Sequence, residues 1–116
     1  MKDYRILFVA AISLIIFACH KPAKIQITNR ITAVKIEEVT WGKFTIASSL
    51  LPGETSEKLV IDRSDEKLPN SQRIYFKMSA NNKTIYLATD ETFLLNEEDD
   101  LLIELKDDTK VSSPNQ

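Results

Sequence analysis

The chain has 116 residues, with 15 Lys and Arg against 17 Asp and Glu and a formal net charge of −2 at pH 7. This length suits a single domain with a modest core, and the balanced charge gives no support for nucleic-acid binding, which needs a clustered basic surface. The only histidine, His20, lies next to the only cysteine near the amino terminus, and the chain has two glycines. The later residues therefore lack a histidine for Ser–His catalysis, the ligands of a His/Cys zinc site and a glycine-rich phosphate loop. We therefore expect a protein that is not an enzyme, with no catalytic residues, metal or cofactor.

The first eighteen residues have the pattern of a secretory signal. Lys2 and Arg5 precede an apolar run over residues 6–18, in which Ser13 is the only polar residue. A cationic start followed by such a run is typical of a signal peptide. The run is shorter than the roughly 20 apolar residues that cross a bilayer. Residues 1–18 are thus predicted to be a cleaved signal peptide rather than a permanent span.

The single cysteine stands where the apolar run ends, in the sequence IFAC at residues 16–19. Ile16, Ala18 and Cys19 resemble the lipobox of bacterial lipoprotein precursors. The resemblance implies that the Cys19 sulfur receives a diacylglycerol, that the chain is cut just before it and that the new amino terminus is acylated. Cleavage after Ala18 without lipid is the alternative.

The same resemblance predicts a location. Lipid on Cys19 would anchor the protein in the bacterial cell envelope, because buried acyl chains hold it at the membrane. His20 stands where an Asp retains Gram-negative lipoproteins at the inner membrane, so we expect the outer membrane, facing the periplasm. Residues 19–23 are predicted to be a short tether, which Pro22 keeps extended.

From Lys24 onward the sequence predicts strands only. Short alternating runs rich in Ile, Val, Thr and aromatic residues favour strands over helices. The expected fold is all-β: one antiparallel β-sandwich of about seven strands, immunoglobulin-like or transthyretin-like, over residues 24–111, followed by a disordered tail at 112–116. Strands are expected near residues 24–28, 31–40, 43–48, 57–62, 72–79, 83–89 and 100–106, with a short extended piece at 92–95.

One hairpin can be predicted with its register. If Asn81-Asn82 is a two-residue turn, Met78 opposes Ile85 and Phe76 opposes Leu87 on one face. Tyr75 and Tyr86 then lie diagonally on the other face, within side-chain reach. One register sorts both strands into an apolar and a mixed face, as a half-buried hairpin requires.

The stretch over residues 31–48 is less regular. The apolar residues switch between odd and even positions after Ala33, across Glu37-Glu38 and at Gly42. In a regular strand each switch would move the apolar side chains to the other face, so we expect bulges or a strand break. Further along, Pro52-Gly53 suits the centre of a type II turn.

Five residues are candidates for contact with a partner, and each also has a purely structural interpretation. Trp41 is either a core anchor or an exposed contact. Leu50 and Leu51 either close the end of the core or project toward a partner or membrane. Tyr75 and Tyr86 either form a binding platform or a structural cross-strand pair.

The acidic segment over residues 96–108 carries seven Asp and Glu side chains against Lys106. Oxygen-rich loops can hold Ca²⁺, but the spacing of a helix–loop–helix calcium loop is missing. We expect a solvated acidic turn before the last strand, and the sequence leaves calcium binding open.

The region after the tether resembles small β-sandwich lipoproteins of uncharacterised function in bacterial envelopes. The resemblance is one of architecture alone, so it does not identify any functional residue. Two functions are therefore considered. The first is a protein-binding or scaffolding module whose partner is another envelope protein. The alternative is a receptor for a small ligand such as a glycan fragment. A concave pocket lined by Trp41 or the tyrosines would favour the ligand, and a convex surface with exposed Leu50 and Leu51 would favour a protein partner.

Overall fold

A computed structural model describes residues 22–62 and 64–114. The expected signal peptide and Cys19 lie outside these residues. Within the described ranges there is no helix long and apolar enough to cross a membrane.

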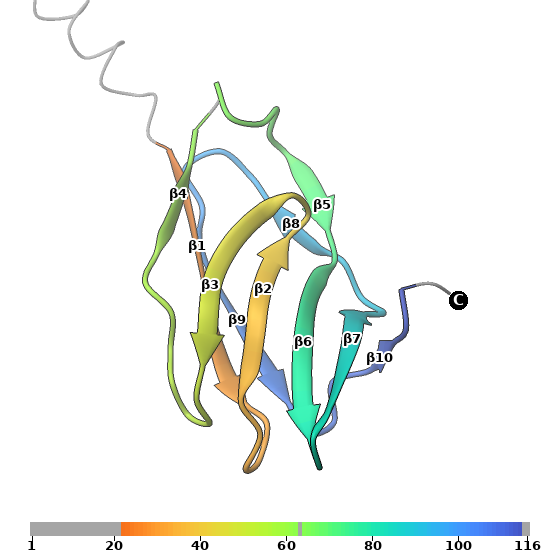
Figure 1. The fold of residues 1–116 in the computed structure, drawn as a ribbon. Coiled ribbons are helices and arrows are strands. Elements are labelled where there is room, and N and C mark those ends of the chain that lie inside the picture. Colours follow the sequence, from red (N-terminus) through yellow and green to blue (C-terminus); the bar gives the residue numbers. More distant parts are fainter. Residues whose placement is uncertain (1–21, 63, 115–116) are drawn as a thin grey trace, which may run out of the picture.

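The described chain forms ten strands in three sheets (Figure 1). The largest sheet has the order β10–β7–β6–β2–β3, built from Val111–Ser112, Lys83–Thr89, Ile74–Ala80, Ile36–Trp41 and Phe44–Leu50. The second sheet has the order β4–β1–β9, built from Leu59–Ile61, Ala23–Arg30 and Asp100–Lys106. A small third sheet pairs β5 (Asn70–Gln72) with β8 (Phe93–Leu95) at one end of the molecule.

The predicted all-β sandwich is confirmed, with differences in detail. There are ten strands rather than about seven, and the strand expected over residues 31–40 begins only at Ile36. The strand β1 pairs with β9 in parallel along its length, from Lys24 opposite Asp100 to Arg30 opposite Lys106, so the sandwich is not purely antiparallel. The single strand expected over residues 72–79 is divided at Arg73 into β5 and β6, which belong to different sheets. The Arg73 carbonyl accepts a hydrogen bond from the Gly42 amide at 3.3 Å, next to the Trp41–Ile74 pair of β2 and β6.

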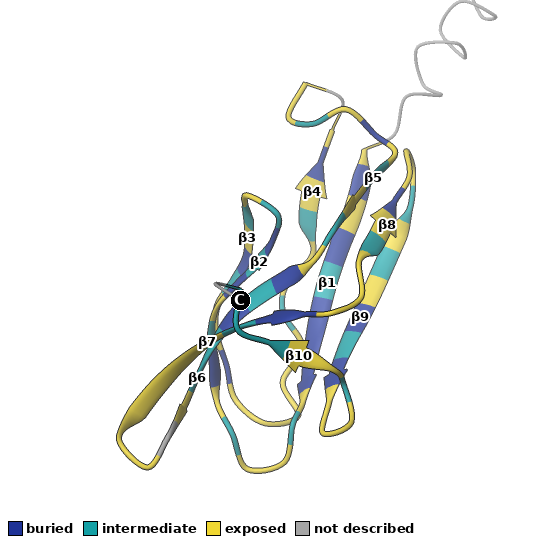
Figure 2. Ribbon diagram, turned by 90° about the vertical axis from the view of Figure 1, so that its right-hand side faces the viewer, coloured by how far each residue is buried: buried dark blue, intermediate teal, exposed yellow. Residues whose placement is uncertain are grey.

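The core lies between the two larger sheets, and buried positions alternate along β9 and along β1 from Ala23 to Ile27 (Figure 2). This alternation follows from the two-residue period of a strand, which sends every second side chain to the same face. The largest fully buried hydrophobic side chains are Trp41, Phe76, Ile25, Ile27, Ile36, Ile61, Ile74, Leu95, Ile103, Leu105 and Val39.

The hairpin of β6 and β7 has the predicted register. Met78 opposes Ile85, Phe76 opposes Leu87, and Tyr75 opposes Ala88. The turn residues Asn81 and Asn82 have φ values of 54° and 63°, the left-handed conformation that asparagine tolerates in such turns.

All three expected irregularities between residues 31 and 48 are present. Ala33 has a φ of 59° in a loop before β2, Glu38 has a φ of 49° where the β2–β6 ladder shifts, and Gly42 has a φ of 57° in the β2–β3 turn. Each position lets the chain reverse the face on which its apolar side chains lie. Gly53 has a φ of 86°, and the Glu54 amide donates to the Leu51 carbonyl at 3.0 Å, as expected of a type II turn.

Two boundaries of the expected domain need correction. Ala23, assigned to the tether, begins β1 and is buried opposite Ile61. Ser112, assigned to the disordered tail, pairs with Ala88 in β10, and its hydroxyl donates to Asp90 Oδ1 at 2.8 Å. Both residues were misassigned because their partners are distant in the sequence.

Candidate functional site

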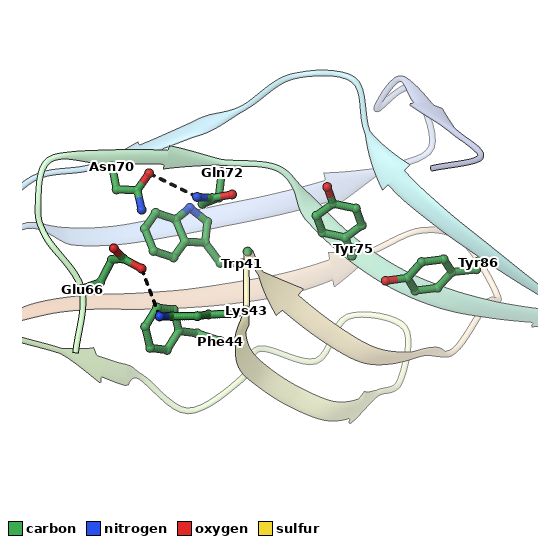
Figure 3. A pocket seen from close by; sticks show the side chains of 9 residues that line it. Trp41, Lys43, Phe44, Glu66, Asn70, Gln72, Tyr75 and Tyr86 are labelled. Carbon is green, nitrogen blue, oxygen red and sulfur yellow. Dashed lines mark hydrogen bonds and ion pairs between the residues drawn. The ribbon is translucent and has the colours of Figure 1, made fainter. Parts of the chain in front are cut away.

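A broad hollow lies where the β2–β3 turn meets β5 and the outer face of the β6–β7 hairpin (Figure 3). We call it the aromatic hollow. It is open to solvent and has a volume of about 480 Å³, within the range of about 300–1,000 Å³ typical of small-molecule sites. Its lining consists of Trp41, Gly42, Lys43, Phe44, Glu66, Asn70, Gln72, Tyr75 and Tyr86.

Trp41 forms the floor of the aromatic hollow. It ends β2, its indole Nε1 donates to the Phe93 carbonyl at 3.0 Å, and its ring stacks on Phe44 with centroids 6.2 Å apart. Because the ring is fully buried, Trp41 is a core anchor, and its candidacy as an exposed contact is wrong. A satisfied indole N–H explains how this polar group can be buried.

Tyr75 and Tyr86 form one wall of the aromatic hollow. Their rings are stacked, with centroids 6.2 Å apart and an interplanar angle of 20°. The hairpin register accounts for this pair, because Tyr75 lies diagonal to Tyr86 on the outer face. Tyr86 is 44% exposed and Tyr75 is half-buried, so both residues contribute to this wall.

The opposite wall carries side-chain amides. The Gln72 amide Nε2 donates to Asn70 Oδ1 at 3.2 Å, which links alternate residues of β5. Gln72 also packs against the β2–β3 turn, since a Cβ at Gly42 would lie 2.9 Å from Gln72 Cγ. Gly42 therefore allows the close approach that places Gln72 at the hollow.

The charged groups of the hollow compensate each other. Lys43 Nζ lies 3.6 Å from Glu66 Oε2 and 5.4 Å from the centroid of the Phe44 ring. Among the residues that the structure describes, no other charged side chain lines the hollow, so these contribute one positive and one negative charge. The charges of the described lining therefore cancel.

Replacing Gly42 with alanine is expected to lower the free energy of unfolding by about 1–3 kcal/mol, because alanine has a cost at positive φ and its Cβ collides with Gln72. In a Gln72→Ala background, the same replacement should have the smaller cost of about 1 kcal/mol from backbone strain alone. Urea denaturation of the four proteins in this cycle measures both costs. Equal costs in the two backgrounds would show that Gln72 does not pack on the turn.

The two leucines of the LLPG loop lie at the other end of β3 and do not share the aromatic hollow. Leu50 is buried in the core, so its candidacy as a contact is wrong and it closes the core instead. Leu51 is 54% exposed at the start of the turn formed by Pro52 and Gly53. The loop is thus divided, with one leucine facing the core and the next facing solvent.

The acidic side chains of residues 96–108 are spread among separate partners. Asp100 pairs with Lys58 at 2.8 Å, and Glu104 pairs with Arg30 at 3.2 Å. The Thr32 hydroxyl and amide donate to Asp107 at 2.6 and 2.8 Å and lower the pKa of that carboxyl. Across residues 22–62 and 64–114, no three His, Cys, Asp or Glu side chains are grouped so that they could hold a metal ion.

One further carboxyl has a shifted pKa. The Ser64 hydroxyl and amide donate to Asp62 and lower its pKa. This exposed turn lies outside the aromatic hollow.

The sequence identified part of this site. Trp41, Tyr75 and Tyr86 were candidates and lie around one hollow, whereas Phe44 and the amides of Asn70 and Gln72 were missed. The missed amides had a local signal: they are separated by one residue, so an extended chain places both on the same face. Their proximity to Gly42 depends on the bend at Arg73 and has no such signal.

Comparison with protein-family models, curated proteins and solved structures found no match to this chain.

Proposed function

We propose that this protein is a lipid-anchored, non-enzymatic lipoprotein of the bacterial cell envelope that binds a glycan fragment in the aromatic hollow. The signal pattern of residues 1–18 and the lipobox-like residues Ile16, Ala18 and Cys19 support the anchor. The outer membrane, with the domain in the periplasm, is the proposed location. The absence of any histidine besides His20 supports a binding role over His-dependent catalysis.

The observation that carries the ligand proposal is the aromatic hollow itself, which Phe44, Tyr75 and Tyr86 line together with the side-chain amides of Asn70 and Gln72. A sugar ring has an apolar face of C–H groups and an edge of hydroxyl groups. The aromatic rings offer apolar surface to the C–H face, and tyrosine adds a hydroxyl for hydrogen bonding. Asn70 and Gln72 supply amide donors and acceptors for sugar hydroxyl groups.

The charges of the hollow favour an uncharged sugar. Lys43 and Glu66 already pair with one another, and separating them to bind an ion would forfeit this interaction. Because the hollow is open to solvent, the affinity is expected to be modest. We therefore infer a short neutral oligosaccharide as the ligand.

Tyr86→Ala and Tyr75→Ala are each expected to weaken oligosaccharide binding by about tenfold or more, because each removes one stacked ring. The detergent-solubilised full chain would be titrated with a panel of short neutral oligosaccharides. Trp41 is the only tryptophan and its buried ring stacks on Phe44 in the lining of the hollow, so we expect its fluorescence to change when the hollow is occupied.

Val60→Ala is the matched control, since Val60 is an exposed apolar strand residue outside the hollow. It should bind like the wild type. Saturable binding that survives both tyrosine replacements, or no binding to any member of the panel, would contradict a glycan site in this hollow.

The second candidate function is the protein-binding or scaffolding module with an envelope protein as its partner. The exposed apolar side chains of Leu51 and Ile85, at 54% and 47% exposure, favour it. The two functions use different surfaces, because neither residue lines the aromatic hollow.

A further inference from the structure

The strand β7 has an edge that is paired over only part of its length. On one side β6 pairs with it from Lys83 to Ala88, whereas on the other side β10 covers only Ala88 and Thr89. Residues 83–87 therefore have no strand partner on that side among the described residues. Figure 2 shows this half of the hairpin projecting beyond the sandwich, with its surface exposed.

The hairpin register identifies which backbone groups are unpaired. Antiparallel residues alternate between pairs that exchange hydrogen bonds and pairs that do not, and a two-residue turn is flanked by a pair that does. Ala80 and Lys83 flank the turn, so the amide and carbonyl of Thr84 and of Tyr86 point away from β6. The next position in this series, Ala88, is the one that pairs with Ser112.

An apolar pocket opens beside this edge. It has a volume of about 130 Å³, and we call it the end pocket. Its lining consists of Ile31, Phe76, Met78, Leu87, Leu105, Lys106, Asp107, Thr109 and Val111. Leu87 and Met78 belong to the inner face of the hairpin, as does Ile85, which is 47% exposed.

We propose that the free edge of β7 and the end pocket together bind an extended segment of a partner protein, which adds a strand to the sheet and inserts one large apolar side chain into the pocket. Strand addition of this kind takes affinity from backbone hydrogen bonds and specificity from pockets for alternate side chains. A strand paired with β7 would place alternate side chains on the face shared by Ile85 and Leu87, and this face leads into the end pocket.

The volume of the end pocket indicates what kind of group could occupy it. A cavity of about 150 Å³ lined by apolar side chains holds one benzene molecule, so the end pocket suits one leucine, methionine or phenylalanine side chain. A free small molecule in the pocket would leave Ile85 and the amides of Thr84 and Tyr86 uncovered. An extended peptide satisfies all three features at once.

The edge strand on the opposite side of the sheet gives a useful contrast. The strand β3 also has no partner on its outer side among the described strands, but its ladder with β2 is irregular between Val39 and Thr40. The groove beside it is bordered mainly by polar side chains, Ser48, Ser49, Glu54, Thr55, Ser56 and Glu57 among them. It therefore lacks the regular ladder and apolar pocket found at β7.

The test uses the detergent-solubilised full chain and short fluorescent peptides of alternating threonine and valine, in which one central position is alanine, aspartate, leucine, methionine or phenylalanine. We expect the large apolar residues to bind at least about tenfold more tightly than alanine or aspartate. N-methylation of alternate peptide amides should abolish binding, because it removes the backbone donors. Binding should also slow hydrogen exchange at the Thr84 and Tyr86 amides.

Two variants localise the site on the protein. Thr84→Pro removes an outward amide, and edge strands tolerate proline at such positions; it should abolish peptide binding. Ile85→Lys changes an exposed side chain and should weaken binding by about tenfold. Leu102→Lys, an equally exposed change on β9, should bind like the wild type.

Three results would overturn the proposal. The first is that no peptide of the set slows exchange at Thr84 and Tyr86. The second is that binding is equal in Ile85→Lys and the wild type. The third is that these amides are protected in the free protein and lose protection when residues 113–116 are removed, which would assign the edge to the chain's own tail.

Discussion

Cys19→Ser is expected to reduce acyl labelling of the protein to background and to remove it from the membrane fraction, or to leave uncut precursor. Serine lacks the sulfur to which, by the lipobox resemblance, the diacylglycerol is joined. Each buried CH₂ contributes about 0.8 kcal/mol to membrane attachment, and two or more chains hold a protein durably. Losing the attachment point therefore removes the whole anchor rather than weakening it.

The measurement is metabolic labelling with an alkyne-bearing fatty acid in cells that express the full chain, followed by membrane fractionation and mass determination of the mature amino terminus. His20→Ala is the matched control, because it changes the neighbouring residue and keeps the sulfur. It should be labelled and should sediment with membranes as the wild type does. A Cys19→Ser protein that keeps label and fractionation would refute the anchor.

Asn29→Ala is expected to lower the free energy of unfolding by about 3 kcal/mol or more. The fully buried Asn29 amide donates to the Val34 carbonyl at 2.8 Å and the Leu50 carbonyl at 3.0 Å. Its Oδ1 accepts the Ile31 amide at 3.1 Å. Alanine would leave two carbonyls and one amide without a partner, and each such group costs about 1–3 kcal/mol when buried.

This loss is large against the total stability of about 5–15 kcal/mol that is usual for a small domain. Asn29→Asp keeps the acceptor but removes both donated bonds and places oxygen against two carbonyl oxygens, so it should also destabilise. Asn96→Ala, at an exposed position, is the control. Urea denaturation of the three variants measures the differences. A change below about 1 kcal/mol for Asn29→Ala would show that water replaces these bonds.

The hairpin of β6 and β7 shows what local pattern can predict. Its register follows from alternating apolar side chains and from Asn81-Asn82, and the structure agrees pair by pair. Bulges or breaks were likewise predicted near Ala33, Glu38 and Gly42, where the alternation of apolar and polar residues is interrupted. All three residues have positive φ values. These features depend on residues near one another in the sequence, so the signal that specifies them is local.

The residues that line the aromatic hollow could be predicted only in part. Tyr75 and Tyr86 were placed together by the hairpin, but Asn70 and Gln72 reach the same hollow only because the chain changes sheets at Arg73. Similarly, the exposure of Trp41 could not be decided from its type. Its burial depends on the carbonyl of Phe93, a residue far along the chain.

By itself, the sequence determined the all-β class, the register of one hairpin and the places of the irregularities between residues 31 and 48, because alternation and turn residues act over a few neighbours. Only the tertiary structure decided the parallel pairing of β1 with β9, the three hydrogen bonds of Asn29 and the open edge of β7. Such features join segments that are distant in the sequence, and the local sequence of one segment does not indicate which other segment it contacts. They are selected by how the whole core packs and by the need to satisfy buried polar groups.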